Sequence, residues 1–302
     1  MAKESVSEVV HALKLNSVNT ILIGHGHYDH AFDVPFLLER DGDHAPTFEN
    51  TTVYVNQTTL GMICANDPGL IGEKCQRVKL IPSEAIEHCV DYSIAQRDQH
   101  DSAPRCKTTQ KPIDLQFARG KVEFRALSSM HTPHISFPRI TFASGSMGHV
   151  PRDPPRRYWS WQSGQNFSFV VDFYSDADAL KYRVYLLDSI IDLPCLVCGN
   201  YQVAPDVTVV AVVPVAGWKK AKNEHEVQLK HLNPDFVLLN HWDNFLQPHP
   251  LVEGGRVISW QPGITQEFMA FVEAMAFEDG KVVKTILRHP GAPITFTECG
   301  IQ

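Results

Sequence analysis

The sequence has little that would place the protein in a membrane or on a nucleic acid. No stretch is apolar for long enough to span a bilayer, and the first ten residues, MAKESVSEVV, lack the apolar core of a signal peptide. Acidic residues outnumber basic ones by 34 to 27, which leaves a formal net charge of −7 and no electrostatic footprint for nucleic acid. Internal repeats and low-complexity tracts are also absent. We therefore expect a cytoplasmic globular protein that acts on a small molecule.

Cysteine is sparse and odd in number, with seven among 302 residues. Cys195 and Cys198 form a C-x-x-C, but no second pair follows at the spacing of a zinc ribbon. We therefore expect buried free thiols, which favours a reducing compartment.

The patterning predicts an α+β protein with one domain over residues 1–302. Apolar or alternating runs predict strands at 19–24, 51–56, 77–82, 121–130, 166–173, 182–187, 206–215, 235–240 and 281–287. Amphipathic segments predict helices at 5–15, 31–39, 57–65, 222–232 and 264–277. Two stretches without a period, 83–114 and 138–165, are expected to be insertions. The first is either a lid over a site or a disordered excursion.

Four potential metal ligands follow the first predicted strand within six residues: His25, His27, Asp29 and His30. In an extended segment His25 and His27 point the same way, so both can bind one ion. Asp29 and His30 lie where the chain turns toward the next helix and can face a second ion. Imidazole and carboxylate are the groups that zinc accepts. The alternative is a solvated histidine-rich loop.

Three later strands also end at potential ligands. His131 follows the strand at 121–130, Asp188 follows the strand at 182–187, and His241 follows the strand at 235–240. His134 lies three residues beyond His131, near enough to contact a substrate. For His131 and His134 the alternative is an ordinary loop histidine.

The H-x-H-x-D-H sequence after a strand resembles the signature of the metallo-β-lactamase-fold hydrolases. That resemblance implies an αββα sandwich with a dinuclear metal site at one edge. It further implies that seven residues hold the metals: His25, His27 and His131 the first, Asp29, His30 and His241 the second, and Asp188 both. Imidazole-rich ligation suits two zinc ions per chain, with manganese or iron as alternatives.

The resemblance also implies a reaction. His27 stands where the related di-iron flavoproteins carry a carboxylate, so the chain resembles the hydrolytic branch, in which a metal-bound hydroxide attacks the substrate. Asp29 and His134 are then the expected catalytic residues. The segments NFSFVVDF, YRVYLLD and LLNHWDNF are similar to a subgroup around ascorbate-6-phosphate lactonase and N-acyl phosphatidylethanolamine phospholipase D, whereas HTPH departs from its pattern. The expected substrate is thus a phosphodiester or a lactone. A thioester, a β-lactam and a non-catalytic metal-binding scaffold stay open.

The chain departs from the family in two places. Only 24 residues precede His25, where family members carry a strand-rich segment. Either the first strands of one sheet are lacking, or the chain is a truncated product that has lost a segment or a signal sequence. Leu187 replaces the usual glycine before the bridging Asp188.

The stretch at 138–165 is rich in aromatic and basic residues. We expect three aromatic residues to line a substrate pocket and three arginines to meet a phosphate: Tyr158, Trp159 and Trp161, and Arg152, Arg156 and Arg157. The alternatives are simple packing on the sandwich or a contact in a homo-oligomer.

Overall fold

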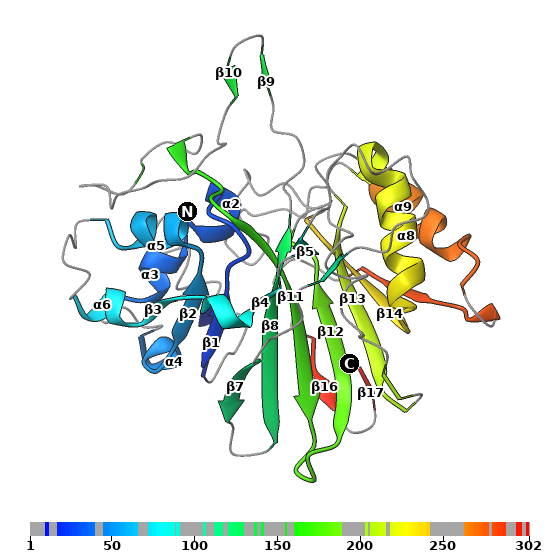
Figure 1. Cartoon of the computed structure of the whole chain (residues 1–302), viewed down its shortest axis with the longest axis horizontal. Helices are drawn as coiled ribbons and strands as arrows, with labels where there is room; N and C mark the ends of the chain where they lie inside the picture. The colour runs from blue at the N-terminus through cyan, green and yellow to red at the C-terminus, as the bar shows by residue number, and fades with distance from the viewer. Residues whose placement is uncertain are drawn as a thin grey trace.

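The structure is a computed structural model of the chain, and it shows a mixed α/β protein with two main sheets (Figure 1). It describes residues 10–11, 17–39, 45–65, 72–87, 89–90, 105–106, 112–116, 120–129, 136–137, 140–141, 155, 160–188, 203–204, 206–215, 218–241, 263–277, 280–287, 294–297 and 300–301.

The smaller sheet holds three parallel strands in the order β1 (Thr20–Leu22), β2 (Thr52–Val55) and β3 (Val78–Leu80). Short helices lie beside it in Figure 1: α3 (Val34–Leu37), α4 (Ala45–Phe48), α5 (Gln57–Ile63) and α6 (Glu73–Gln76). Side chains of β2 alternate between its two faces, because successive residues of a strand point opposite ways. Val53 and Val55 pack with the helices, whereas the Tyr54 ring lies 5.0 Å from that of Phe124 in the larger sheet.

The larger sheet has eight strands, seven of them in the order β15-β14-β13-β12-β11-β8-β4, with β7 also paired to β8. Their bounds are β4 Ile86–Glu87, β7 Ile113–Gln116, β8 Lys121–Ser129, β11 Asn166–Tyr174, β12 Leu180–Leu186, β13 Thr208–Pro214, β14 Phe236–Asn240 and β15 Lys284–Ile286. Strands β12 to β15 are parallel, and β11 is antiparallel to both neighbours. Helices α8 (Lys222–Leu232) and α9 (Ile264–Glu273) connect successive parallel strands.

Three apolar clusters fill the spaces between the sheets and the helices. One holds Val53 with residues of α3 and α5, between the smaller sheet and its helices. The second joins the two sheets through residues such as Phe124 and Val210. The third holds Val213 and Phe268, between the larger sheet and helices α8 and α9. Along β13 the alternation is complete, since Val210 faces the other sheet while its neighbours Val209 and Ala211 face the helices.

The strands that lead toward the predicted ligands end at a common edge. Parallel β12 and β14 flank β13, so their carboxyl ends point the same way. The last residue of β8, Ser129, pairs with the first of β11, Asn166, and therefore lies at that edge as well. In open sheets the crevice at such strand ends is where ligands bind.

Several segments differ from the sequence prediction. The helix expected at 31–39 is divided into α2 (Tyr28–Ala31) and α3, with a turn between them. The strand expected to be last is followed by a hairpin of β16 (Phe296–Thr297) and β17 (Gly300–Ile301). The predicted helix at 222–232 is confirmed as α8.

The two predicted insertions contain short paired strands. Within 83–114, η1 (Ser83–Ala85) leads into β4, which pairs with β8, and β5 (Cys89–Val90) pairs with β6 (Arg105–Cys106). Strand β7, at the end of this stretch, also pairs with β8. Around the second stretch, β9 (Ser136–Phe137) pairs with β10 (Ile140–Thr141). The remainder of 83–114 and most of 138–165 lie outside the described residues.

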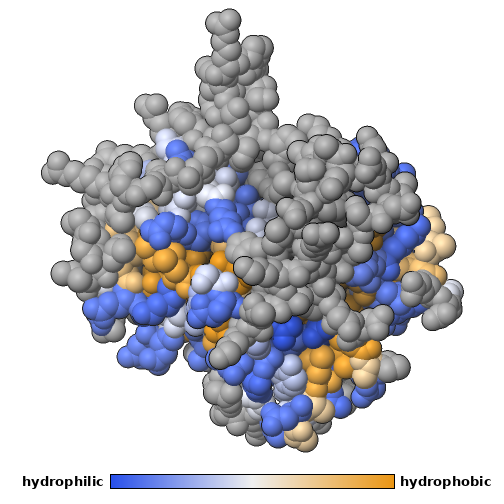
Figure 2. All heavy atoms as spheres, in the orientation of Figure 1, coloured by the Kyte–Doolittle hydropathy of each residue, from blue (hydrophilic) through white to orange (hydrophobic). Residues whose placement is uncertain are grey.

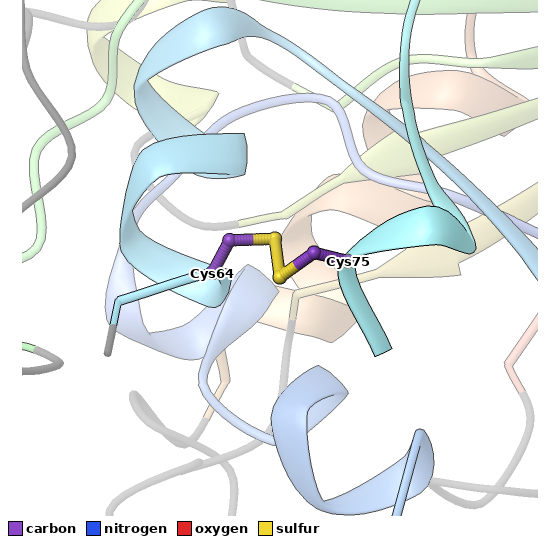
Figure 3. The surroundings of a disulfide bond; sticks show 2 residues. All are labelled: Cys64 and Cys75. Atoms are coloured by element: carbon purple, nitrogen blue, oxygen red, sulfur yellow. A yellow bond between two sulfur atoms is a disulfide. The ribbon is translucent and has the colours of Figure 1, made fainter. Parts of the chain in front are cut away.

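Cys64 and Cys75 form a disulfide, so the expectation of free thiols is wrong for this pair (Figure 3). Cys64 is the C-cap of α5 and Cys75 lies in α6, and both side chains are buried in the cluster behind the smaller sheet. Sequence spacing did not reveal the pair, because it is the packing of both α5 and α6 on β3 that brings the two Cα atoms to 5.6 Å. The inference of a reducing compartment rested on free thiols, and this disulfide removes part of that basis.

Within the part of the chain that the structure describes, no helix combines the length and the apolar character that crossing a bilayer requires. On the face shown in Figure 2, apolar areas are separated by hydrophilic ones.

Candidate metal centre

The ligand-rich loop begins where β1 ends. His25 follows this strand and is buried, with 1% of its surface exposed. His27 has extended backbone angles and is the N-cap of α2, while Asp29 and His30 lie within that helix. Asp29 and His30 were expected where the chain turns toward a helix, but in the structure they already lie inside helix α2. The first turn of α2 orients both side chains, which are 15% and 16% exposed.

Two glycines allow close packing around this loop. A Cβ atom on Gly24 would overlap the carboxylate of Asp188, so only glycine lets Asp188 approach His25 from this side. A Cβ atom on Gly26 would overlap the carbonyl oxygen of Gln162 and lie 2.5 Å from Cε of Met62. The glycines on either side of His25 therefore let Asp188, Gln162 and Met62 pack closely against the loop.

Asp188 stands two residues beyond β12 and contacts two histidines with its two carboxylate oxygens. Oδ2 lies 2.5 Å from Nδ1 of His25, and Oδ1 lies 3.0 Å from Nδ1 of His30. Each oxygen of the Asp188 carboxylate therefore has its own histidine partner.

A second cluster lies on the other side of His30. Nε2 of His30 is 3.5 Å from Oδ2 of Asp29, and the same oxygen is 2.8 Å from Nε2 of His241. The rings of His30 and His241 are stacked, with centroids 5.5 Å apart. The structure thus brings together the three residues expected to share one ion.

His241 has a left-handed backbone, with φ of 52°. That conformation is uncommon for a residue with a side chain and often occurs at functional sites. The amide of His241 donates to the side-chain oxygen of Asn240 over 2.7 Å, which helps to hold the turn. The strained turn directs the imidazole back toward α2.

His27 adjoins the first cluster. Nδ1 of His27 lies 2.9 Å from Nε2 of His25, and the two rings meet edge to face at 4.5 Å. Six of the eight candidate residues therefore converge at one place. His131 and His134 lie outside the described residues.

Burial and neighbouring charges shift the proton affinities of the cluster. Burial lowers the pKa of His25 to about 4, and nearby His30 acts in the same direction. Burial also disfavours a charged His30, but Asp188 and Asp29 outweigh it and raise its pKa to about 9. Burial raises the pKa of each carboxyl, yet histidines hold both far below the ordinary range: mainly His241 for Asp29, and His30 for Asp188. Both carboxylates are consequently charged at neutral pH.

This set of donors fits divalent transition metals. Two trios of side chains, His25 with His30 and Asp188, and Asp29 with His30 and His241, each place their ligand atoms within 4.8 Å of one another. Two donors on one tetrahedral zinc ion lie roughly 3.3 Å apart, given bonds of about 2.0–2.1 Å. The contacts quoted above, from 2.5 to 3.5 Å, lie near this separation, and His30 faces the first trio with Nδ1 and the second with Nε2.

Trp161 was expected to line a substrate pocket, and that expectation is wrong. Its side chain is 1% exposed and belongs to the cluster behind the smaller sheet, where its ring lies 5.8 Å from that of Phe32. Its indole N–H donates to the carbonyl of Pro155. Burial of this large ring in the core satisfies both its apolar surface and its single donor. Tyr158, Trp159 and the three arginines lie outside the described residues.

Sequence reasoning missed residues that support the centre without binding in it. Gly24 gives Asp188 its space, and Asn56 caps α5 beneath the loop. The sequence could have predicted the capping role of Asn56, because Asn directly before a helix is a preferred N-cap. For Gly24 the only signal was a glycine at the end of the strand.

Comparison with protein-family models gave no match to this chain, and comparison with curated proteins found none similar to it.

Proposed function

We propose that the protein is a metal-dependent hydrolase with a dinuclear centre. The observation that carries the proposal is the double contact of Asp188, which joins His25 on one side to His30 on the other, while His30 in turn faces Asp29. An imidazole binds a metal ion through one nitrogen when neutral, so His30 can serve only one ion. We place it with Asp29 and His241.

The remaining ligands then belong to the other ion. His25 and His27 lie side by side, and Asp188 reaches both halves of the centre. His131 remains the predicted third histidine of this ion. With zinc, each ion would have three protein ligands of its own and the shared carboxylate.

The proposed fold follows the same resemblance. We infer that the two sheets and their outer helices form an αββα sandwich of the metallo-β-lactamase type. Three apolar clusters in the order helix–sheet, sheet–sheet and sheet–helix support this arrangement, as does the position of the ligands at one edge (Figure 1).

Bound divalent ions would lower the pKa of water toward about 7 and polarise the oxygen of a substrate ester. The residues of the chain bind the ions and orient the water and the substrate. Burial keeps His25 neutral, and a neutral imidazole is the form that binds metal. Asp29 is charged and partly accessible, so it can bind an ion and accept a hydrogen bond from a water molecule beside it. His134 remains the predicted substrate contact.

We favour an ester-like substrate, a phosphodiester or a lactone. This choice rests on the resemblance of three short segments, NFSFVVDF, YRVYLLD and LLNHWDNF, to the lactonase and phospholipase subgroup. The negative carboxylates also favour cationic cofactors, which in turn attract an anionic phosphodiester. Thioester and β-lactam hydrolysis are the second candidates.

Metal content decides between an enzyme and a scaffold. The protein is purified, stripped with a chelator, reloaded with zinc or manganese, desalted and measured by mass spectrometry. We expect two ions per chain. Protein that retains no metal after reloading contradicts the proposal.

A substrate panel then tests the reaction. Reloaded protein is assayed with a chromogenic phosphodiester, an acyl lactone, a glutathione thioester and a penam, each with zinc and with manganese. Turnover of the phosphodiester or lactone supports the proposal. Turnover of the thioester or penam alone overturns the substrate choice and leaves the metal centre standing.

A further inference from the structure

Asn56 makes three hydrogen bonds beneath the ligand-rich loop and is 4% exposed. Its carbonyl oxygen accepts from the amide of Thr59 over 2.8 Å, which caps helix α5. Its amide nitrogen donates to the carbonyl oxygens of Ser163 and Gln165, over 2.9 and 2.6 Å. One of these bonds caps the start of α5, and the other two reach residues more than 100 positions away. Asn56 therefore joins α5 to the segment before β11.

The segment that Asn56 binds also holds the metal loop. The carbonyl oxygen of Ser163, one of the two acceptors of Asn56, also accepts from the amide of Gly26 over 2.9 Å. Gly26 is the residue between His25 and His27. On the other side of His25, the carbonyl of Gly24 accepts from the amide of Phe167 over 2.9 Å. The backbone around His25 is thus fixed by residues 163–167.

Close packing leaves this segment little freedom. Gly164 has φ of 64° and lies against the start of α5, where an added Cβ atom would be 2.6 Å from Cβ of Thr58 and 2.7 Å from Oδ1 of Asn56. Gly26 in turn packs on Met62 of α5. Helix α5, residues 163–165 and Gly26 therefore form one interlocked support, and Asn56 is the side chain that bonds two of its three parts.

We propose that Asn56 is a positioning residue of the metal centre, which sets the direction of the His25 and His27 imidazoles through Ser163 and Gly26. This inference rests on the proposed function, because it concerns the affinity of that centre. Its three hydrogen bonds go to Thr59, Ser163 and Gln165 and to none of the predicted ligands that the structure describes, so its effect passes through the shared carbonyl of Ser163. Partners that hydrogen-bond directly to metal ligands commonly change metal affinity by about 10–100-fold, and for Asn56, which acts through the carbonyl of Ser163, we expect the lower end of that range.

Two substitutions separate capping from positioning. N56D keeps the size and the capping oxygen but replaces the amide nitrogen, which carries both N–H donors, with one oxygen that repels the carbonyls of Ser163 and Gln165. N56S also caps the helix but is too short to reach either carbonyl. As a control, F268L removes packing from α9, on the far side of the larger sheet, and destabilises the protein without touching this support.

The experiment has two readouts. Hydrogen exchange at the Gly26 amide is followed in the metal-free protein, and zinc affinity is measured by competition with a chromogenic chelator. We expect faster exchange at Gly26 and about 10-fold weaker zinc binding in N56D and N56S, with neither change in F268L at matched loss of melting temperature. If N56D fails to fold, N56S gives the same comparison.

The outcomes distinguish this inference from the proposed function. If the parent protein binds no zinc, the proposed function fails, whereas exchange at Gly26 still reports on the support. If Gly26 exchanges normally and zinc affinity stays within twofold of the parent in both Asn56 variants, the positioning role is overturned. Equal losses of affinity in F268L would reduce the effect to general stability and overturn it as well.

Discussion

Nε2 of His241 lies 2.8 Å from Oδ2 of Asp29, although 212 positions separate the two residues in the chain. One comes from the end of β14 in the larger sheet and the other from α2, next to the smaller sheet. The contact forms only when the two sheets pack together, so the second half of the centre depends on the whole fold.

D29A should remove one metal ion and most of the activity while the fold persists. The Asp29 carboxylate is a shared partner of His30 and His241, so its loss leaves the proposed second ion with these two histidines and the shared Asp188. We expect one ion per chain in place of two, and turnover reduced by about 100-fold or more. Metal analysis and the phosphodiester assay measure both effects. D176A, in an exposed turn, serves as control, and near-normal turnover in D29A argues against a two-metal mechanism.

G24A should displace Asp188. The added methyl group takes the space of the Asp188 carboxylate, so that side chain must move away from His25. We expect a loss of zinc affinity of at least about 10-fold, by analogy with changes to residues that orient ligands. G280A, whose added Cβ atom would meet nothing within 4 Å but whose φ is 68°, shows what a strained and uncrowded glycine substitution costs away from the centre. Zinc binding in G24A equal to that in G280A contradicts the displacement.

His225 should make the protein sensitive to acid. This residue of α8 is fully buried against Phe268, and neither ring nitrogen has a hydrogen-bond partner in the described part of the chain. Burial lowers its pKa from 6.5 to about 4. Between these values the unfolded chain binds the proton and the folded chain does not, so stability is lost as pH falls from 6.5 toward 4. The loss from this group is about 3 kcal/mol.

Urea denaturation at pH 7 and pH 5 tests this assignment with H225L as the comparison. The variant lacks the titrating group, so its stability should fall less between the two pH values than that of the parent. If the free energy of unfolding falls by the same amount between pH 7 and pH 5 in parent and variant, His225 does not contribute to acid sensitivity.

Removal of the Cys64–Cys75 disulfide should cost about 2–3 kcal/mol of stability, because the bond closes a loop of 11 residues in the unfolded chain. The C64A/C75A double variant measures this in guanidinium. A reducing agent should destabilise the parent by a similar amount and leave the variant unaffected. Seven reactive thiols in the denatured, unreduced parent would show that the bond does not form.

The sequence determined the parts of this protein that local chemistry specifies. Alternation and apolar runs located β13 and β14, and helix α8 has its predicted bounds, because side-chain periodicity is set within a few residues. The loop from His25 to His30 was recognisable as a ligand cluster for the same reason. Asp188 and His241 were predicted because each follows a predicted strand and because the resemblance implies ligands at those strand ends.

The tertiary structure decided how these pieces meet. Which oxygen of Asp188 faces which histidine depends on the space above Gly24, and the sharing of Ser163 between Asn56 and Gly26 depends on the docking of α5. The disulfide and the burial of Trp161 were likewise beyond the sequence, since spacing does not show which surfaces of α5 and α6 face each other, or which aromatic residues reach the core. These relationships join residues distant along the chain, and only packing brings such residues within a few ångströms.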